Sequence, residues 1–360
     1  MKNVQIGLPW LVRMKPGALQ RLGLYLARPC LASVALFHSE GLPQSILDVA
    51  LQSLRTHGIA LTLLHEVNEA SVEEAVRLLG AVPPSCKALV GAGGGKALDV
   101  AKYTASLAGL PYFAVPTSVS SDGFCAPQAS LTLEGKRRSR VDVAVCQRAP
   151  LTLWHSGVGD LSSKFTAVAD WTLAFHRRGV PVNDLAALMS DASVFQFMAN
   201  PVSDEQGIRL LATALMLNGV AMEIAGSSRP ASGSEHLISH ALDMTGASQR
   251  PHGLQTGAAA YPVSSLQSGS HHQRIGELFA RTGFWESGPK AALLQRGMED
   301  RRGASTFGER GFLYDPLRDG RMAGVRHDDR PRHGSHWMLR MTATRTYHDA
   351  DNAISPSPIA

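Results

Sequence analysis

The chain has 360 residues, of which 44% are hydrophobic and 18% charged, with a formal net charge of +5. This length predicts two domains with sizeable cores, and we see no apolar run near the ~20 residues that cross a bilayer. Residues 301–360 hold ten Arg, six Asp and one Glu, so +3 of the charge lies in a basic tail rather than in a groove. We therefore expect no nucleic-acid partner and no membrane partner.

Four cysteines lie far apart along the chain: Cys30, Cys86, Cys125 and Cys146. Their spacing favours buried free thiols over a disulfide framework or a cysteine zinc site. The N-terminal residues lack a continuous apolar stretch followed by a small-residue cleavage site. Together these features predict a cytoplasmic protein.

The first 150 residues alternate strand and helix signals. In chain order we expect strands at 33–37, 59–64, 88–90 and 112–117, and helices at 42–56, 71–79 and 96–107. Ser71 and Glu74 have the spacing of a capping box at the start of the second helix. Residues 130–134 and 140–145 flank a polar turn and resemble an antiparallel hairpin. The alternation predicts a mostly parallel sheet covered by helices.

From about Thr152 long helical periods replace this alternation, at 159–174, 183–198, 205–225, 234–244 and 256–266. The second domain is therefore predicted to be all-helical, with a boundary near Pro150. We expect three parts: an α/β nucleotide-binding domain at 1–150, a helical metal and substrate domain at 151–300, and a poorly ordered, Arg-rich tail at 301–360.

A glycine-rich loop at 91–99, with the sequence GAGGGKALD, follows an apolar run and precedes a helical segment. Such a loop lets the backbone approach a diphosphate, while the helix N-terminus supplies free N–H donors. A polar elbow at 116–123 follows another strand, where ligands of open α/β sheets bind. An ordinary tight turn is the alternative interpretation of each segment.

The helical half carries carboxylate, ammonium and imidazole groups at suggestive spacings. Asp160 lies in the first turn of a predicted helix, with Lys164 four residues later on the same face. His236 and His240 share one helix face, and His252 begins a later helical segment. One carboxylate and two imidazoles from separate elements would make a three-ligand divalent metal site with an open position.

The order of these pieces resembles metal-dependent polyol dehydrogenases related to dehydroquinate synthase, and most closely the sn-glycerol-1-phosphate dehydrogenases. The matching segments are GAGGGKALDVAK, VPTSVSSDG, GVGDLSSKFTAVADW, and SGSEHLISHALD followed by HG. The resemblance implies a dehydroquinate synthase-like fold, with an α/β NAD(P)-binding domain and an all-α metal-binding domain. It also implies an NAD(P)H cofactor and one divalent metal, zinc first, with nickel or iron as alternatives.

The resemblance also implies roles for individual residues. The implied metal ligands are Asp160, His236 and His252. The implied cofactor contacts are Gly93, Gly94 and Gly95 for the diphosphate, and residues around Thr117, Ser118 and Asp122 on the nicotinamide side. Lys96 and Asp99 are also predicted to bind the cofactor. The predicted catalytic residues are Asp122, Lys164 and His240, the last for substrate positioning or proton relay, with packing as its alternative.

Lys164 separates the branches of this superfamily, since related iron-dependent alcohol dehydrogenases place a histidine ligand four residues after the aspartate. An ammonium at that position suits a phosphorylated polyol. We therefore expect interconversion of dihydroxyacetone phosphate and sn-glycerol 1-phosphate, with Lys164 left for the substrate's phosphate.

Several alternatives stay open. The strand ending at 37–41 has no aspartate at its tip to clasp a ribose 2′-hydroxyl, so both NADH and NADPH remain candidates. The alternative functions are a glycerol dehydrogenase or other polyol dehydrogenase, a cyclitol or dehydroquinate-type synthase using bound NAD, and an inactive homologue with a degraded C-terminus. Association into a homo-oligomer is a further open question.

Overall fold

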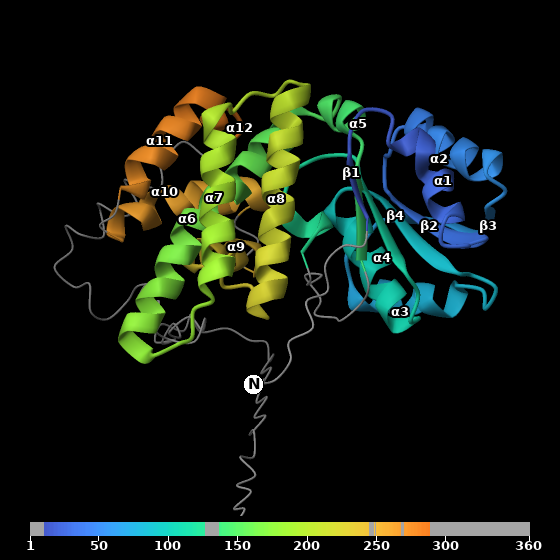
Figure 1. Ribbon diagram of the computed structural model, residues 1–360, viewed down its shortest axis with the longest axis horizontal. Coiled ribbons are helices and arrows are strands. Elements are labelled where there is room, and N and C mark those ends of the chain that lie inside the picture. The colour runs from blue at the N-terminus through green and yellow to red at the C-terminus, as the bar shows by residue number, and fades with distance from the viewer. Residues whose placement is uncertain (1–10, 127–136, 245–247, 249, 268–269, 289–360) are drawn as a thin grey trace, which may run out of the picture. The chain divides into compact units, whose positions relative to one another are not determined.

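Six parallel strands form one sheet within the described part of the chain (Figure 1). They are β1 (Val12–Met14), β2 (Ser33–Ser39), β3 (Ala60–Val67), β4 (Ala88–Gly93), β5 (Tyr112–Pro116) and β6 (Arg137–Val141). The computed structural model describes residues 11–126, 137–244, 248, 250–267 and 270–288. The first arm of the predicted hairpin, 130–134, and the predicted tail, 301–360, lie outside these residues.

The strand order is β1-β6-β5-β4-β2-β3. All strands are parallel, but the side of the sheet to which the chain adds its next strand changes between β2 and β4. From β2 the chain continues outward to β3, whereas from β4 it continues to β5 on the other side. The carboxyl ends of β2 and β4 therefore flank the crevice where open α/β sheets bind their ligands. The glycine loop leaves β4 at this point.

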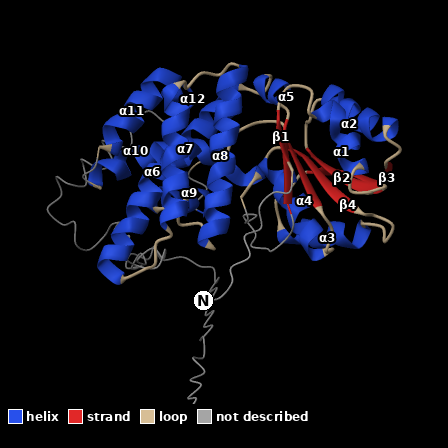
Figure 2. Cartoon of the chain, in the orientation of Figure 1, coloured by secondary structure: helices blue, strands red, loops and turns tan. Residues whose placement is uncertain are grey.

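Helices cover both faces of the sheet (Figure 2). Leu36 and Val90 pack with α1 (Leu22–Ala27) and α2 (Gln44–Thr56) on one face. Phe37 and Leu89 pack with α3 (Val72–Ala81) and α4 (Gly95–Leu107) on the other. The Ser71 hydroxyl accepts the Glu74 N–H at 3.1 Å, which confirms the Ser71 half of the predicted capping box, whereas the Glu74 carboxylate contacts His65 and Arg77.

The second arm of the predicted hairpin is wrong as an antiparallel strand over 140–145. β6 pairs in parallel with β5 and β1, and residues Val143–Gln147 form helix α5. Asp142 explains the change, because its Oδ1 accepts the N–H of Ala144 at 3.1 Å while its Oδ2 accepts the N–H of Leu19 at 2.8 Å. This cap starts a helix where the alternating valines favoured a strand.

Beyond α5 the described chain is helical. Its helices are α6 (Leu151–Arg178), α7 (Asp184–Ala199), α8 (Glu205–Ala225), α9 (Ser234–Met244), α10 (His252–Leu266), α11 (His271–Thr282) and α12 (Phe284–Ser287). The predicted bounds of α8 and α9 are confirmed, while α6 and α10 begin earlier than expected and α11 was not predicted. By length and composition α8 could cross a membrane, but half of that apolar window is buried inside the fold.

None of the four cysteines forms a disulfide, as expected. Cys86, Cys125 and Cys146 are buried, whereas Cys30 is exposed and departs from the expected burial. Burial, helped by the nearby Asp142 carboxylate, raises the pKa of the Cys146 thiol to about 12. At neutral pH this thiol is therefore protonated and unreactive.

Candidate functional site

Glycines let α6 and α10 approach each other backbone to backbone. A Cβ atom on Gly159 would overlap the carbonyl oxygen of Gly253, and one on Gly257 would overlap the Cα of Gly159. No side chain fits at these positions unless a helix moves. Because Asp160 follows Gly159 and His252 precedes Gly253, this contact brings two of the predicted ligands together.

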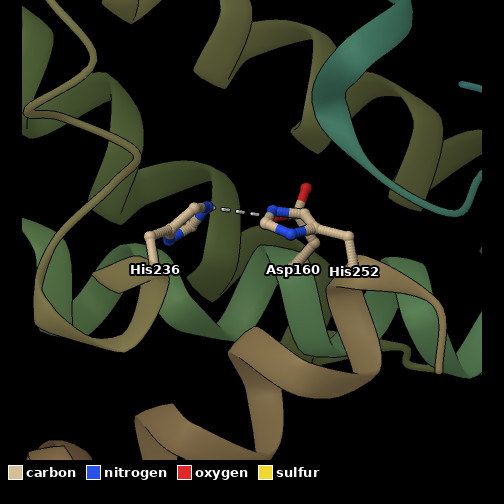
Figure 3. Close-up of side chains that lie close together, drawn as sticks. All are labelled: Asp160, His236 and His252. Carbon is tan, nitrogen blue, oxygen red and sulfur yellow. Dashed lines mark ion pairs between the residues drawn. The ribbon is translucent and has the colours of Figure 1, made fainter. Parts of the chain in front are cut away.

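Asp160, His236 and His252 converge from three helices (Figure 3). Each offers one ligand atom, and these atoms all lie within 4.8 Å of one another. Asp160 comes from the middle of α6, His236 from the first turn of α9, and His252 is the first residue of α10. The Nε2 atom of His236 lies 3.8 Å from Oδ1 of Asp160. The structure thus places together the three residues predicted as metal ligands.

The chemistry of this donor set fits a divalent cation. A carboxylate oxygen with two imidazole nitrogens is a common three-ligand set for zinc that leaves a position open. The second ring nitrogen of each histidine already has a partner: Nδ1 of His236 lies 2.8 Å from Glu235 Oε1, and Nδ1 of His252 lies 3.1 Å from Ser239 Oγ. Such partners orient histidine ligands in metal sites.

Glu235 is a site residue that the sequence did not reveal. Its buried carboxylate accepts the Gly233 N–H and the Thr166 hydroxyl, each at 2.7 Å, besides contacting His236. Burial opposes its ionisation, but these contacts, with His236 first, hold the pKa of Glu235 below its usual value. Adjacent helical residues normally project apart, so the pair in the sequence SEH gave no signal.

His252 and His240 differ in burial and in their position relative to the ligand cluster. Burial first, and then the proximity of His236, lower the pKa of His252 to about 4, so this imidazole is neutral at physiological pH and can act as a ligand. His240 is exposed, with its ring centroid 6.5 Å from that of His236 and 6.2 Å from that of His252. It therefore lies beside the ligand cluster rather than in it.

Lys164 is wholly buried, with 0% of its side chain exposed. Its ammonium lies 3.0 Å from Asp160 Oδ1 and 3.0 Å from Asp122 Oδ2, and it donates to the Ala231 carbonyl at 3.2 Å. An ammonium has three hydrogens, and all three have acceptors here. The expectation that Lys164 is left for a substrate phosphate is therefore not met in this arrangement. Lys164 instead ties α6 to the elbow and to the segment before α9.

Asp122 lies at the start of the short 3-10 helix Asp122–Phe124, in the polar elbow. Its N–H donates to Asp160 Oδ2 at 2.8 Å, so Asp160 is held through both oxygens. Burial raises the pKa of Asp122, and the Asp160 carboxylate raises it further. Burial also opposes ionisation of Asp160, but the Lys164 ammonium, with the two histidines, brings the pKa of Asp160 below its ordinary value.

The three predicted diphosphate glycines have different surroundings. Gly93 has a φ of +136°, and a Cβ there would overlap the Ser39 hydroxyl, so the packing of β2 alone requires this glycine. The Gly94 N–H donates to Ser39 Oγ at 2.9 Å. Gly95 faces open space, with no atom within 4 Å of its hypothetical Cβ. Of the three glycines, Gly95 in the first turn of α4 is therefore the one with open space beside it.

The other predicted cofactor residues line the same edge of the sheet. Lys96 is exposed, while Asp99 pairs with Lys102, whose ammonium also donates to the Gly123 carbonyl at 2.7 Å. The Thr117 N–H donates to the Gly93 carbonyl at 3.1 Å, which fixes the elbow against the glycine loop. Ser118 is buried and lies 3.4 Å from the Ser120 hydroxyl. Their contacts with a cofactor stay predictions.

Comparison with known proteins shows which family the chain belongs to. A family model described as iron-containing alcohol dehydrogenase matches residues 13–153. The glycerol-1-phosphate dehydrogenase (NAD(P)+) of Thermofilum pendens is 36% identical over 292 residues, covering 77% of this chain and 83% of that protein. The chain belongs to the glycerol-1-phosphate dehydrogenase family. A family member from Korarchaeum cryptofilum is 36% identical and covers 64% of this chain and 81% of its own length.

Solved structures share the fold of this glycerol-1-phosphate dehydrogenase family member. A probable glycerol dehydrogenase from Sinorhizobium meliloti superposes with a TM-score of 0.64 at 18% identity, covering 79% of this chain and 82% of that one. The glycerol dehydrogenase of Schizosaccharomyces pombe gives 0.62 at 19% identity, covering 79% and 77%. The predicted dehydroquinate synthase-like fold is confirmed, and the chain is an oxidoreductase.

Proposed function

We propose that the chain interconverts dihydroxyacetone phosphate and sn-glycerol 1-phosphate, with NADH or NADPH as the hydride carrier. The observation that carries this proposal is the convergence of Asp160, His236 and His252, with Asp160 hydrogen-bonded to Asp122 in the elbow that follows β5. The substrate comes from the names of relatives 36% identical to this chain.

In this proposal the cofactor's diphosphate lies against Gly95 and the first turn of α4, where free backbone N–H groups and the helix dipole favour an anion. Thr117 and Ser118 at the elbow lie toward the nicotinamide. The bond from Thr117 N–H to the Gly93 carbonyl supports this placement, because it keeps the two segments in register.

Asp160, His236 and His252 would hold a divalent metal, zinc first. Such a cation supplies Lewis-acid polarisation of the substrate carbonyl when it is bound. The chain's own groups prepare that position. Lys164 and the Asp122 N–H orient the Asp160 carboxylate, and Glu235 orients His236.

His240 is our candidate for positioning the substrate. It is exposed, it lies beside both cluster histidines, and burial of part of its ring lowers its pKa, so it is neutral at physiological pH. A neutral imidazole can donate or accept one hydrogen bond, as a polyol hydroxyl requires.

The test is an assay of the purified full-length chain with dihydroxyacetone phosphate and each reduced cofactor. The assay is repeated after chelation and again after adding zinc or nickel. We expect oxidation of NADH or NADPH that is lost on chelation, restored by metal, and accompanied by glycerol 1-phosphate of sn configuration. Turnover that is faster with unphosphorylated dihydroxyacetone would instead favour a glycerol dehydrogenase. Absence of turnover under every condition would refute the proposal.

A further inference from the structure

The side-chain amide of Gln255, in the first turn of α10, has one orientation that satisfies its neighbours. One end of the amide lies 2.9 Å from the Arg250 carbonyl oxygen and 2.9 Å from Asp243 Oδ1. A carbonyl oxygen only accepts hydrogen bonds, and so does a carboxylate. The end that faces them is therefore the NH2 group, and Oε1 points the other way, 3.0 Å from Ser239 Oγ.

The orientation of Gln255 decides what Ser239 can do. Because Gln255 Oε1 is an acceptor, the single hydroxyl hydrogen of Ser239 is donated to it. Toward His252, whose Nδ1 lies 3.1 Å away, the Ser239 oxygen can then only accept. That contact requires a hydrogen on Nδ1. Its lone pair is therefore left on Nε2, the ring nitrogen that remains for the ligand cluster.

We propose that Ser239 and Gln255 are positioning residues that hold His252 as its Nδ1–H tautomer and so present Nε2 to Asp160 and His236. This inference rests on the proposed metal site. Ser239 is 0% exposed and Gln255 is 3% exposed, so water does not compete for these hydrogen bonds. His236 obtains the same tautomer from the carboxylate of Glu235, whereas the partners of His252 are the uncharged side chains of Ser239 and, behind it, Gln255.

The direct test needs no metal. The full-length chain is labelled with 15N-histidine, and the nitrogen shifts of its imidazoles are recorded in the metal-free protein, with His252→Gln to assign the signals of His252. We expect Nδ1 of His252 to be protonated and Nε2 unprotonated. In Ser239→Ala and Gln255→Met we expect both tautomers of His252 to appear. The signals of His236 should stay unchanged.

A second measurement is zinc affinity by competition with a chelator. Loss of such partners weakens metal binding by about 10- to 100-fold, and we expect that range for Ser239→Ala. Ser264→Ala is the matched control. Like Ser239 in α9, Ser264 in α10 is a buried serine, and its hydroxyl lies 3.3 Å from a histidine Nδ1, that of His272 outside the cluster. Its zinc affinity should stay within about twofold of the parent.

The outcomes are distinguishable. A wild-type His252 with its proton on Nε2 overturns the inference, whether or not any variant folds. So does zinc binding by Ser239→Ala that matches Ser264→Ala. If the parent chain binds no zinc, the proposed metal site fails, and the tautomer of His252 still decides whether Ser239 and Gln255 orient it.

Discussion

The Lys164 ammonium lies 3.0 Å from Asp122 Oδ2 and joins that carboxylate to Asp160, whose Oδ1 is also 3.0 Å away. Burial opposes the charge on Lys164, but the two carboxylates raise its pKa above the ordinary lysine value. The ammonium therefore stays charged throughout the physiological range. In this arrangement it pairs with two buried carboxylates at once.

Replacing this ammonium tests that role. Lys164→Met leaves two buried carboxylates without their cation, and breaking a buried pair costs about 3–5 kcal/mol of unfolding free energy. We expect this loss in urea unfolding, and an equal fall in kcat/KM for dihydroxyacetone phosphate and dihydroxyacetone. The exposed Lys87→Met is the control and should change neither quantity. A selective rise of KM for the phosphate ester would show that Lys164 does reach the substrate.

Gly159→Ala tests the contact between α6 and α10. Its new methyl group would overlap the Gly253 carbonyl, so the helices must separate, at a cost of about 3 kcal/mol or more. We expect a lower Tm and weaker zinc binding, since Asp160 and His252 move apart. Gly80→Ala in α3 is the control, because its Cβ enters open space and should leave Tm unchanged or raise it. A Gly159→Ala protein as stable as Gly80→Ala would contradict this account of the packing.

Two glycines of the loop allow an effect on cofactor binding to be distinguished from an effect on stability. Gly95→Ala meets no atom of the chain, so its stability should match the parent, while its methyl group occupies the room left for the diphosphate. We expect NADH affinity to fall by about tenfold, or 1.4 kcal/mol, in a fluorescence titration. Gly93→Ala should instead lower Tm through its clash with Ser39. Unchanged NADH affinity in Gly95→Ala would place the cofactor elsewhere.

The surroundings of the Asp191 carboxyl group, on α7, predict that the stability of the chain depends on pH. Burial raises its pKa to about 6, and its Oδ1 is buried without a hydrogen-bond partner. The folded chain then binds more protons than the unfolded chain between about pH 4 and 6, so its contribution to stability falls as pH rises through that window. Asp191→Asn should match the parent at pH 4 and exceed it by about 1–2 kcal/mol at pH 7.5. Urea titrations at both pH values measure this difference, and an equal difference at both would exclude Asp191 as its source.

Local patterns predicted the elements that have local causes. Ser71 caps α3 through its hydroxyl, and Asp204 caps α8 by accepting the Gly207 N–H at 2.8 Å, so both helices begin where their sequences indicate. β1 has only three residues and depends on pairing with β6, which no local pattern reports. The strand expected through Val145 failed because Asp142 caps a helix there.

Some features of the candidate site could likewise be predicted from the sequence, and others could not. The resemblance to the polyol dehydrogenases, carried over residue by residue, predicted that Asp160, His236 and His252 would come together. The partners of Lys164 could not be predicted, because the Ala231 carbonyl is backbone and Asp122 comes from a distant elbow. The partner of His252 Nδ1 also depends on a tertiary contact, with Ser239 of α9, whereas that of His236 Nδ1 is the neighbouring residue Glu235.

The position of β1 at the edge of the sheet has a consequence for the order of folding. Its register joins Val12 to Ser139 and Met14 to Val141, so its partner strand is synthesised long after it. During synthesis β1 must wait while β2 to β5 emerge and pair among themselves. Such non-local pairing is slow, because a long loop must close before any contact compensates for it. Among the strands that the structure describes, the edge of the sheet is thus completed by β1, which is synthesised before the other five.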